Sequence, residues 1–299
     1  MATATRLKLH TMLGNYPNTK ALKSGAVSSE LVDFDFVEVK VANNLFKQVV
    51  RDAKYDVAEL AIVTYLQAKA YGKPYVLVPA VVVSRGQHHT IAYNADRGVL
   101  KPSELNGKRV GVRAYTVTTG TWVRGILASD YGIDIDKVEW ITFEDPHLAE
   151  YHDPATVKRA PAGKELTQML LDGEVAVGIV GDKLPDPKFK QLIPDADAAA
   201  QKWAERHQGV PINHMVVIRE ELSRSRPDAV RDIFRQLHES KLAAGLPDGG
   251  ALDPYRFGVE ACRPILEIII DFCHQQKLIP RRVSVDELFD DTTRALGTA

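Results

Sequence analysis

Residues Lys108–Leu127 read KRVGVRAYTVTTGTWVRGIL, and this stretch decides the fold of the chain. Lys108–Arg113 alternates basic residues with Val and Gly, which predicts a buried strand. After a short turn, apolar residues recur at helical spacing, so we expect a helix over Thr118–Tyr131. A threonine is its expected N-cap and Gly132 its expected stop. The stretch therefore predicts one strand–turn–helix unit of an α/β lobe.

The start of this helix is a candidate anion site. Free backbone N–H groups and the positive end of the helix dipole are expected there, beside the hydroxyls of Thr118, Thr119 and Thr121. Arg124 lies one turn further and offers a planar, two-pronged partner for a carboxylate. Threonine caps are common, so this stretch alone favours an ordinary capped helix. The rest of the chain shifts the balance toward substrate binding.

The composition is that of an ordinary globular protein. The 299 residues exceed what one compact core usually holds, so we expect two lobes. Hydrophobic residues make up 45% and charged residues 26%, and the formal net charge is −1. Because there is no polybasic run, neither nucleic acid nor an anionic membrane is an expected partner. We expect a small-molecule partner, and self-association into a homo-oligomer is left open.

The N-terminal segment and the cysteines favour the cytoplasm. Met1–Asn15 lacks the continuous apolar core of a secretory signal, and no apolar run reaches the roughly 18 residues that span a bilayer. Cys262 and Cys273 lie eleven residues apart in a predicted helix, about 16 Å along its axis. A disulfide needs Cα atoms within about 7 Å, so we expect two free thiols in a reducing compartment.

Strand-like and helix-like segments alternate along the chain, which predicts doubly wound sheets. Two extended segments, near Arg85–Tyr93 and near Gly209–His214, interrupt this alternation and are the expected crossings between lobes. The first lobe is then discontinuous, residues 1–91 and 213–299, and the second lobe is residues 92–212.

This order of elements resembles the type 2 periplasmic-binding-protein fold, in which the ligand lies in a cleft between two lobes. The phrase ELNGKRVGV, Glu104–Val112, is typical of that superfamily. Further motifs resemble the 4,5-dihydroxyphthalate decarboxylases from about Asp33 to about Lys241. These motifs are Asp56–Leu60, Tyr65, Ser84–Arg85, His88–His89, Tyr93–Asn94, Thr121–Leu127, Tyr131–Gly132, Trp140 and Pro211–Arg219. The resemblance implies a two-lobed α/β fold with doubly wound mixed sheets, and a decarboxylase of a hydroxylated aromatic carboxylate.

Such a decarboxylation replaces CO₂ by a proton at a ring carbon, so a general acid must reach that carbon. Histidine suits this task near neutral pH. The expected catalytic residues are His89, His214 and Glu59. The expected substrate-binding residues are Arg85, His88, Thr118, Thr119, Thr121 and Arg124. The histidines and Glu59 match no compact metal motif, so no metal or other cofactor is expected.

The same residues also have plainer interpretations. Glu59 ends an apolar strand, where ligands bind in open α/β sheets, but it serves equally well as a charge at the next helix start. His88 and His89 point opposite ways in an extended segment, and His89 is favoured because it matches the family's histidine. His214 follows the second crossing, where a structural role is the common alternative. Three other histidines, His147, His152 and His207, are expected in solvent, and the tryptophans in the core.

Two departures from the family pattern leave the substrate open. The chain has His88-His89-Thr90 where the family is expected to have Arg-His-Ser, and Glu144–Ala162 differs from the family's usual loop. Other proteins on this fold give the alternatives: a solute-binding protein, a menaquinone-pathway dehydratase or a thiamine-precursor synthase. The motifs at Thr121–Leu127 and His214–Arg219 favour the decarboxylase.

Overall fold

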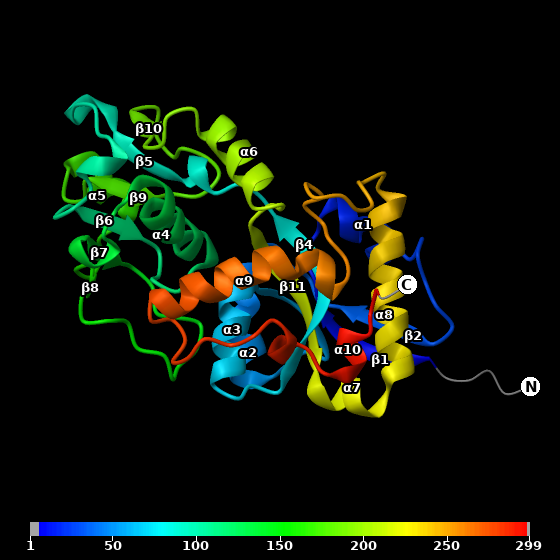
Figure 1. Ribbon diagram of the computed structural model, residues 1–299. Coiled ribbons are helices and arrows are strands. Elements are labelled where there is room, and N and C mark those ends of the chain that lie inside the picture. The colour runs from blue at the N-terminus through cyan, green and yellow to red at the C-terminus, as the bar shows by residue number, and fades with distance from the viewer. Residues whose placement is uncertain (1–5, 298–299) are drawn as a thin grey trace, which may run out of the picture.

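The computed structural model describes residues 6–297 and contains two mixed β-sheets flanked by helices (Figure 1). The first sheet has five strands in the order β2-β1-β3-β11-β4. Strands β1, β2 and β3 are parallel, and β11 runs antiparallel to both β3 and β4. The strands of this sheet are β1 (Leu7–Met12), β2 (Val32–Phe36), β3 (Val57–Ala61), β4 (Tyr75–Ser84) and β11 (Ile212–Arg219).

The second sheet has six strands in the order β10-β5-β9-β6-β7-β8. Strand β6 pairs in parallel with β7 and β9, whereas β5 is antiparallel to β9 and β10. Its strands are β5 (Ile91–Asn94), β6 (Arg109–Val112), β7 (Glu139–Thr142), β8 (Val157–Arg159), β9 (Val177–Ile179) and β10 (Phe189–Gln191).

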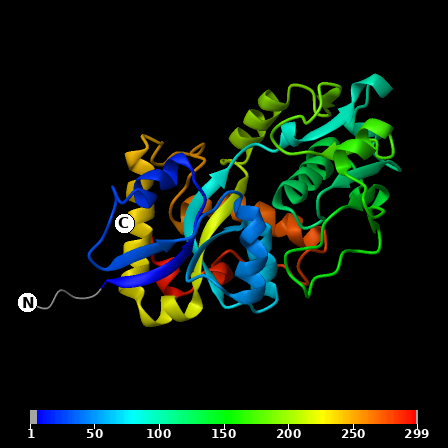
Figure 2. The ribbon, with the colours of Figure 1, turned by 180° about the vertical axis from the view of Figure 1, so that it is seen from behind.

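The chain passes between the two sheets twice. It leaves the first sheet after Ser84 at the end of β4 and enters the second at Ile91 in β5. It returns at Ile212, the first residue of β11. Figures 1 and 2 show the sheets side by side, each with its own helices. The predicted two-lobed α/β architecture with mixed sheets is confirmed, and the lobe limits at residues 91 and 213 stay a prediction.

Both faces of the first sheet are covered, and this explains why β4 is apolar along most of its length. Val76, Val78 and Ala80 lie in a core with α1 and α8, whereas Leu77 and Val81 point into a second core with α2, α3 and α9. The helices of the chain are α1 (Pro17–Lys23), α2 (Phe46–Asp52), α3 (Ile62–Ala70), α4 (Thr118–Tyr131), α5 (Leu166–Asp172), α6 (Ala196–Arg206), α7 (Glu220–Ser225), α8 (Pro227–Ala243), α9 (Val259–Gln275) and α10 (Asp291–Arg294). None of the helices within residues 6–297 is long and apolar enough to cross a bilayer.

Helix α4 spans the predicted residues and ends at Gly132, whose φ of 65° is the left-handed conformation that glycine favours. Its N-terminus differs from the prediction, because the N-cap is Val117 and no side chain caps the helix. The hydroxyl of Thr118 instead accepts a hydrogen bond from the N–H of Val63, 3.3 Å away at the start of α3. The Thr121 hydroxyl donates back to the carbonyl of Val117. The Thr118 hydroxyl is thus engaged by a tertiary contact and the Thr121 hydroxyl by a local bond, so neither caps the helix.

Helix α4 packs closely on α9 and so joins the second lobe to the C-terminal part of the chain. The Trp122 ring meets Phe272 edge to face, with ring centroids 5.7 Å apart. Its indole N–H donates to the carbonyl of Ile212, at the second crossing, over 2.8 Å. The predicted burial of all three tryptophans is confirmed, and Cys262 and Cys273 are buried free thiols as expected.

Replacing Gly125 by alanine should lower the free energy of unfolding by about 1–3 kcal/mol. The added Cβ would lie 2.1 Å from Cδ2 of Phe272, so the buried Phe272 ring or one of the two helices must move. Urea denaturation measures the difference. Ser129→Ala, at an exposed position of the same helix, is the control and should stay within about 0.5 kcal/mol of wild type. Equal stability of Gly125→Ala and wild type would contradict this packing.

Candidate active site

Glu59, a predicted site residue, is a buried carboxylate that accepts three hydrogen bonds. It lies in the middle of β3 with no exposed surface. Its Oε1 accepts hydrogen bonds from Nδ1 of His214 at 2.5 Å and from the Tyr16 hydroxyl at 2.6 Å, and its Oε2 accepts one from the Gly14 N–H at 2.8 Å. Burial acts to raise the pKa of this carboxyl, but the hydrogen bonds and the charge of His214 outweigh burial and hold the pKa below its usual range. Glu59 is therefore a carboxylate at neutral pH.

His214 is held by Glu59 on one nitrogen and leaves the other free. Strand β11 is antiparallel to β3 and pairs His214 with Ala61, two residues beyond Glu59. The ring stands edge to face on Phe46 with centroids 5.2 Å apart, and 21% of the side chain is exposed. Within residues 6–297 no hydrogen bond involves Nε2. A neutral or protonated imidazole in this orientation presents Nε2 to a ligand.

His147 is buried, contrary to the expectation that it lies in solvent. Its Nδ1 is 2.8 Å from the Thr64 hydroxyl, and its ring packs edge to face with Phe46. Burial, aided by the charge of Arg113, lowers the pKa of His147 to about 3. The sequence suggested solvent because polar residues surround His147, yet the segment folds back on α2 and α3. His152, by contrast, is exposed as predicted.

Arg85 and His89, in the first crossing, meet at one aspartate. The Arg85 guanidinium forms an ion pair with Oδ1 of Asp182 at 2.6 Å, and Nε2 of His89 lies 3.3 Å from the same oxygen. Arg85 also reaches the Thr119 hydroxyl at the start of α4, 3.4 Å away. His89 is therefore paired with a carboxylate on the second lobe, and within the described residues it forms no hydrogen bond with Glu59 or His214.

His88 faces a different environment from His89. It lies in the short 3-10 turn η2 (His88–Thr90) and is 2% exposed. Burial, which outweighs the opposing charge of Asp130, lowers its pKa to about 4. His88 is therefore neutral at pH 7, and its buried position differs from that of a side chain directed at a substrate.

A cavity of about 360 Å³ lies at the carboxyl ends of β6, β7 and β9 and the start of α4. Ligands bind at these ends in open α/β sheets. Apolar side chains of Val117, Phe143 and Leu166 line it together with Thr119 and Arg113. Its lining residues include Val112, Arg113, Val117, Thr119, Phe143, Glu144, Glu165, Leu166, Thr167, Ile179 and Val180. An aromatic ring between apolar walls and a carboxylate beside Thr119 fit this lining.

Two residues of the site were missed by the sequence analysis. Arg113 lines the cavity and donates to Glu144 and, across the lobes, to Oδ1 of Asn43 at 2.8 Å. Tyr16 donates to Glu59 from a turn more than forty residues away. Arg113 is the last residue of the predicted strand Lys108–Arg113, and this position was the available signal, because side chains at the carboxyl end of a strand lie at the ligand-binding edge of a sheet.

Arg124 does not reach the cavity, so the expectation that it meets a substrate carboxylate is wrong. Its side chain is 0% exposed and stacks on the Tyr115 ring at 3.9 Å. It donates to the carbonyl of Tyr115 at 2.6 Å and to Gln276 at 2.7 Å. Thr121 is fully buried beside it. Because α4 packs against both α3 and α9, the Arg124 side chain lies in the protein interior. There its hydrogen bond to the Tyr115 carbonyl stabilises the β6–α4 turn.

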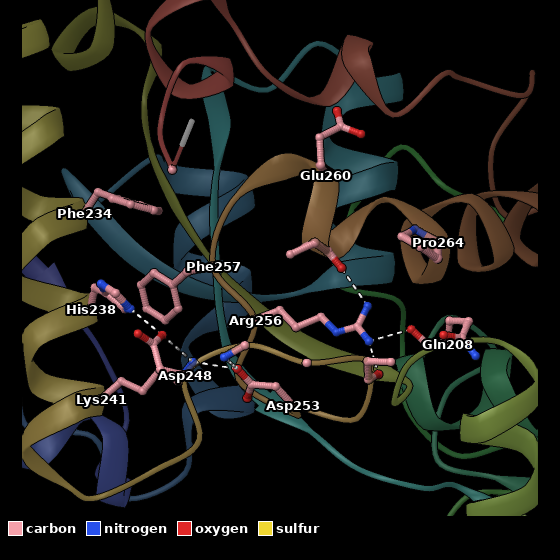
Figure 3. Close-up of a pocket in the computed structure, with 15 residues that line it drawn as sticks. Gln208, Phe234, His238, Lys241, Asp248, Asp253, Arg256, Phe257, Glu260 and Pro264 are labelled. Carbon is pink, nitrogen blue, oxygen red and sulfur yellow. Dashed lines mark hydrogen bonds and ion pairs between the residues drawn. The ribbon is translucent and has the colours of Figure 1, made fainter. Parts of the chain in front are cut away.

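A second cavity, of about 480 Å³, lies apart from these residues between α8, the loop before α9 and the start of α9 (Figure 3). A buried ion pair between Lys241 and Asp253, 2.7 Å long, fastens the loop to α8. Arg256 donates to the carbonyls of Ala261 and Gln208, and the latter belongs to the second crossing. No predicted site residue lines this cavity. Its charged side chains hold the loop and the crossing in place.

Metal binding finds no support in side-chain clusters of the described part of the chain. No three His, Cys, Asp or Glu side chains there lie together as a metal site would require. The carboxylate of Glu59 is instead occupied by a phenol, an imidazole and a backbone N–H.

Comparison with curated proteins places these residues in a family. A 4,5-dihydroxyphthalate decarboxylase of Comamonas testosteroni is 31% identical over 254 residues, 80% of this chain and 76% of the relative. A protein of the same name from Pseudomonas putida is 33% identical over 213 residues, 66% of this chain and 81% of the relative. The chain belongs to the 4,5-dihydroxyphthalate decarboxylase family. No protein-family model matches the sequence.

Solved structures show the fold of this member of the 4,5-dihydroxyphthalate decarboxylase family. The periplasmic aliphatic sulphonate binding protein SsuA of Escherichia coli aligns with a TM-score of 0.58 at 12% identity, over 96% of this chain and 92% of that one. SsuA of Xanthomonas axonopodis pv. citri, bound to MOPS, aligns at 0.56 and 12% identity over 97% and 99%. The desulfurization enzyme DSZB aligns at 0.52 and 15% identity over 96% and 98%. The predicted periplasmic-binding-protein-like fold is confirmed.

The two buried histidines should make this decarboxylase-family protein less stable in mild acid. Burial lowers the pKa values of His88 and His147 from the ordinary 6.5 to about 4 and about 3. The unfolded chain therefore binds their protons first, and stability falls as pH drops below about 6.5. The loss for each histidine should reach the order of 2 kcal/mol at pH 4.5.

The test is urea denaturation of wild type and of His88→Asn, His147→Asn and the double variant, from pH 7.5 to 4.5. Carboxylates with lowered pKa values begin to lose their stabilising effect only near the lower end of this range, about pH 5, and they do so equally in wild type and variants. Each variant should show a weaker decline of unfolding free energy with falling pH. His152→Asn, at an exposed position, should decline like wild type. Parallel curves for all five proteins would count against buried neutral histidines.

Proposed function

We propose that this protein is a carboxy-lyase that decarboxylates a hydroxylated aromatic carboxylate, 4,5-dihydroxyphthalate or a close analogue. The relatives of the same family carry this activity in their names. The observation that supports it within the site is the Glu59–His214 pair, in which a buried carboxylate orients an imidazole whose Nε2 forms no hydrogen bond with any residue from 6 to 297. A role as a solute-binding protein is not favoured, because the sequence relatives are decarboxylases.

The reaction requires a proton donor and a ring rich in electrons. In 4,5-dihydroxyphthalate each carboxylate-bearing carbon is para to a hydroxyl, which pushes electron density toward that carbon. Nε2 of protonated His214 gives its proton to this carbon, and a ring electron pair forms the C–H bond. The bond to the carboxylate then breaks, its electron pair restores the aromatic ring, and CO₂ leaves. His214 takes a new proton from solvent.

Of the two catalytic histidines expected from the sequence, His214 fits the role of proton donor better. The Glu59 carboxylate accepts its Nδ1–H, fixes the ring orientation and stabilises the imidazolium before proton transfer. Nε2 of His89 already faces Asp182. His88 is neutral at pH 7, because its pKa is lowered to about 4 by burial. Glu59 therefore acts through His214, and His89 belongs to the binding side of the site.

The carboxylate that the substrate keeps is proposed to bind between Arg85 and Thr119. Thr119 stands at the N-terminus of α4, where the helix dipole favours an anion. The Asp182 carboxylate at 2.6 Å from Arg85 stands where a substrate carboxylate would compete for the guanidinium. We propose that binding displaces Asp182. Arg113 lines the same cavity as Thr119. Thr118, Thr121 and Arg124 then shape the helix start from inside, without contact to the substrate.

We propose that the protein is cytoplasmic. Cys262 and Cys273 are buried free thiols, and the reducing cytoplasm is the compartment in which thiols stay unpaired.

The activity itself is tested by incubation of the purified protein with a panel of hydroxylated benzoates and phthalates. CO₂ release and loss of the substrate's ultraviolet band should appear with 4,5-dihydroxyphthalate or a near isomer. Phthalate without hydroxyl groups should not react, because its ring lacks the electron donation that protonation needs. Binding of a hydroxyphthalate without any CO₂ release would support a solute-binding role and contradict the proposal.

Removal of the acid or of its partner should lower kcat with little change in KM. His214→Asn should reduce kcat by about 10²–10⁴, because the group acts in the transition state. Glu59→Gln keeps the shape of the side chain but removes the charge, so a comparable loss is expected. His152→Asn, at the surface, should behave like wild type. Near-normal turnover of His214→Asn, or activity lost on chelation and restored by a metal, would refute the assignment.

Loss of the proposed anion site should change mainly KM, whereas loss of the proton donor changes mainly kcat. Arg85→Met should raise KM by about 10-fold or more, since a carboxylate–guanidinium contact contributes about 1.5–3 kcal/mol. The fall in kcat should be smaller, because Arg85 binds ground state and transition state alike. Arg282→Met, at an exposed surface pair with Glu267 and Asp271, is the matched control. An unchanged KM for Arg85→Met would move the substrate carboxylate elsewhere.

A further inference from the structure

Tyr16 contacts the same carboxylate oxygen as His214. Oε1 of Glu59 accepts the Tyr16 hydroxyl at 2.6 Å and Nδ1 of His214 at 2.5 Å. We infer that Tyr16 is a positioning residue, whose hydroxyl fixes the Glu59 carboxylate and limits how strongly that carboxylate holds the His214 proton. The inference rests on the proposed function in one respect, namely that His214 is the proton donor. The coupling of Tyr16, Glu59 and His214 is independent of the substrate.

The turn that carries Tyr16 is arranged around the carboxylate. The Gly14 N–H donates to the second oxygen, Oε2, at 2.8 Å. The Thr19 hydroxyl accepts the Tyr16 N–H at 3.0 Å and donates to the carbonyl of Gly14 at 2.8 Å, so the two donors are tied together. A Cβ on Gly14 would lie 2.5 Å from the Tyr16 ring. Only glycine lets the ring pass close enough for its hydroxyl to reach Glu59.

The phenol stays a donor at every working pH. Burial first, then the negative charge of Glu59 and the hydrogen bond to it, raise the pKa of Tyr16 far above its usual range, and the charge of Arg85 opposes this only in part. Tyr16 therefore keeps its proton and always gives a hydrogen bond to Oε1. A buried carboxylate that accepts three hydrogen bonds holds one orientation, and its partner His214 does so too.

The coupling follows from competition for one oxygen. Two donors share the charge of Oε1, so each hydrogen bond is weaker than it would be alone. Without the phenol, Oε1 serves His214 alone and favours the imidazolium more strongly. The acid then keeps its proton to higher pH but releases it less readily to a ring carbon. The other charged or titratable groups that act on this cluster are Lys23 from α1, Arg85 from the first crossing and His147 from the loop after β7.

Tyr16→Phe is the decisive variant, since it keeps the ring and removes only the hydroxyl. We expect kcat for decarboxylation at neutral pH to fall by roughly 3- to 10-fold, with KM within about 2-fold of wild type. The alkaline limb of the kcat profile should move up by roughly 0.5–1 pH unit. Gly14→Ala should reproduce this shift, because its Cβ pushes the ring away from Glu59. Tyr131→Phe, half-buried at the end of α4, is the matched control and should match wild type.

A second readout needs no substrate. In protein labelled with ¹³C-histidine, the His214 resonance is assigned from its absence in His214→Asn. Its titration midpoint should rise in Tyr16→Phe by the same roughly 0.5–1 pH unit and stay in place in Tyr131→Phe. An unchanged midpoint would overturn the inference, even if kcat falls, because a purely structural role lowers activity without this shift. A shifted midpoint in a protein that decarboxylates none of the panel would uphold the coupling and reject the proposed function alone.

Discussion

The buried carboxylate of Glu59 constrains the whole site. A charge in the middle of β3, between two apolar cores, costs several kcal/mol unless donors surround it. Those donors come from two distant places in the chain: the turn after β1, which supplies the Tyr16 hydroxyl and the Gly14 N–H, and the start of β11, which supplies His214. Strands β3 and β11 of the first lobe must therefore pair in one register, and that register also orients the His214 ring. Stability and the geometry of the reacting group depend on one set of hydrogen bonds.

The second lobe is fastened to the first by contacts of a different kind. Trp122 donates to the carbonyl of Ile212, and Arg256 donates to that of Gln208. Both hydrogen bonds hold the second crossing between the lobes in place. Arg113 and Arg85 span the lobes through side chains that remain partly exposed. The buried contacts set where the lobes meet. The partly exposed ones can change partners at low cost, as a site that admits a substrate requires.

Arg124 illustrates how a motif can be real and its interpretation wrong. A two-pronged cation one turn into a helix suits a carboxylate partner, and the apolar neighbours Val123 and Ile126 offer the alternative that the side chain points to solvent. In the fold α4 is covered by α3, α9 and the β6–α4 turn, so the position that would face a ligand on an exposed helix faces the interior. Nε and Nη2 of the guanidinium donate to an amide and a carbonyl, its plane packs on Tyr115 and Trp140, and Nη1 has no hydrogen-bond partner within residues 6–297.

The sequence by itself determined the alternating α/β order, the two crossings and the family, because apolar periodicity, glycine stops and short motifs are local properties. It also brought Glu59, His89 and His214 forward as titratable groups at strand ends and crossings. Only the tertiary structure separated them: β3 and β11 pair so that Glu59 meets His214, whereas His89 meets Asp182 on the other lobe. Tyr16, Arg113 and the burial of His147 likewise emerged from contacts between segments far apart in the chain. Direction and burial of a side chain depend on what packs against it, and no local pattern carries that information.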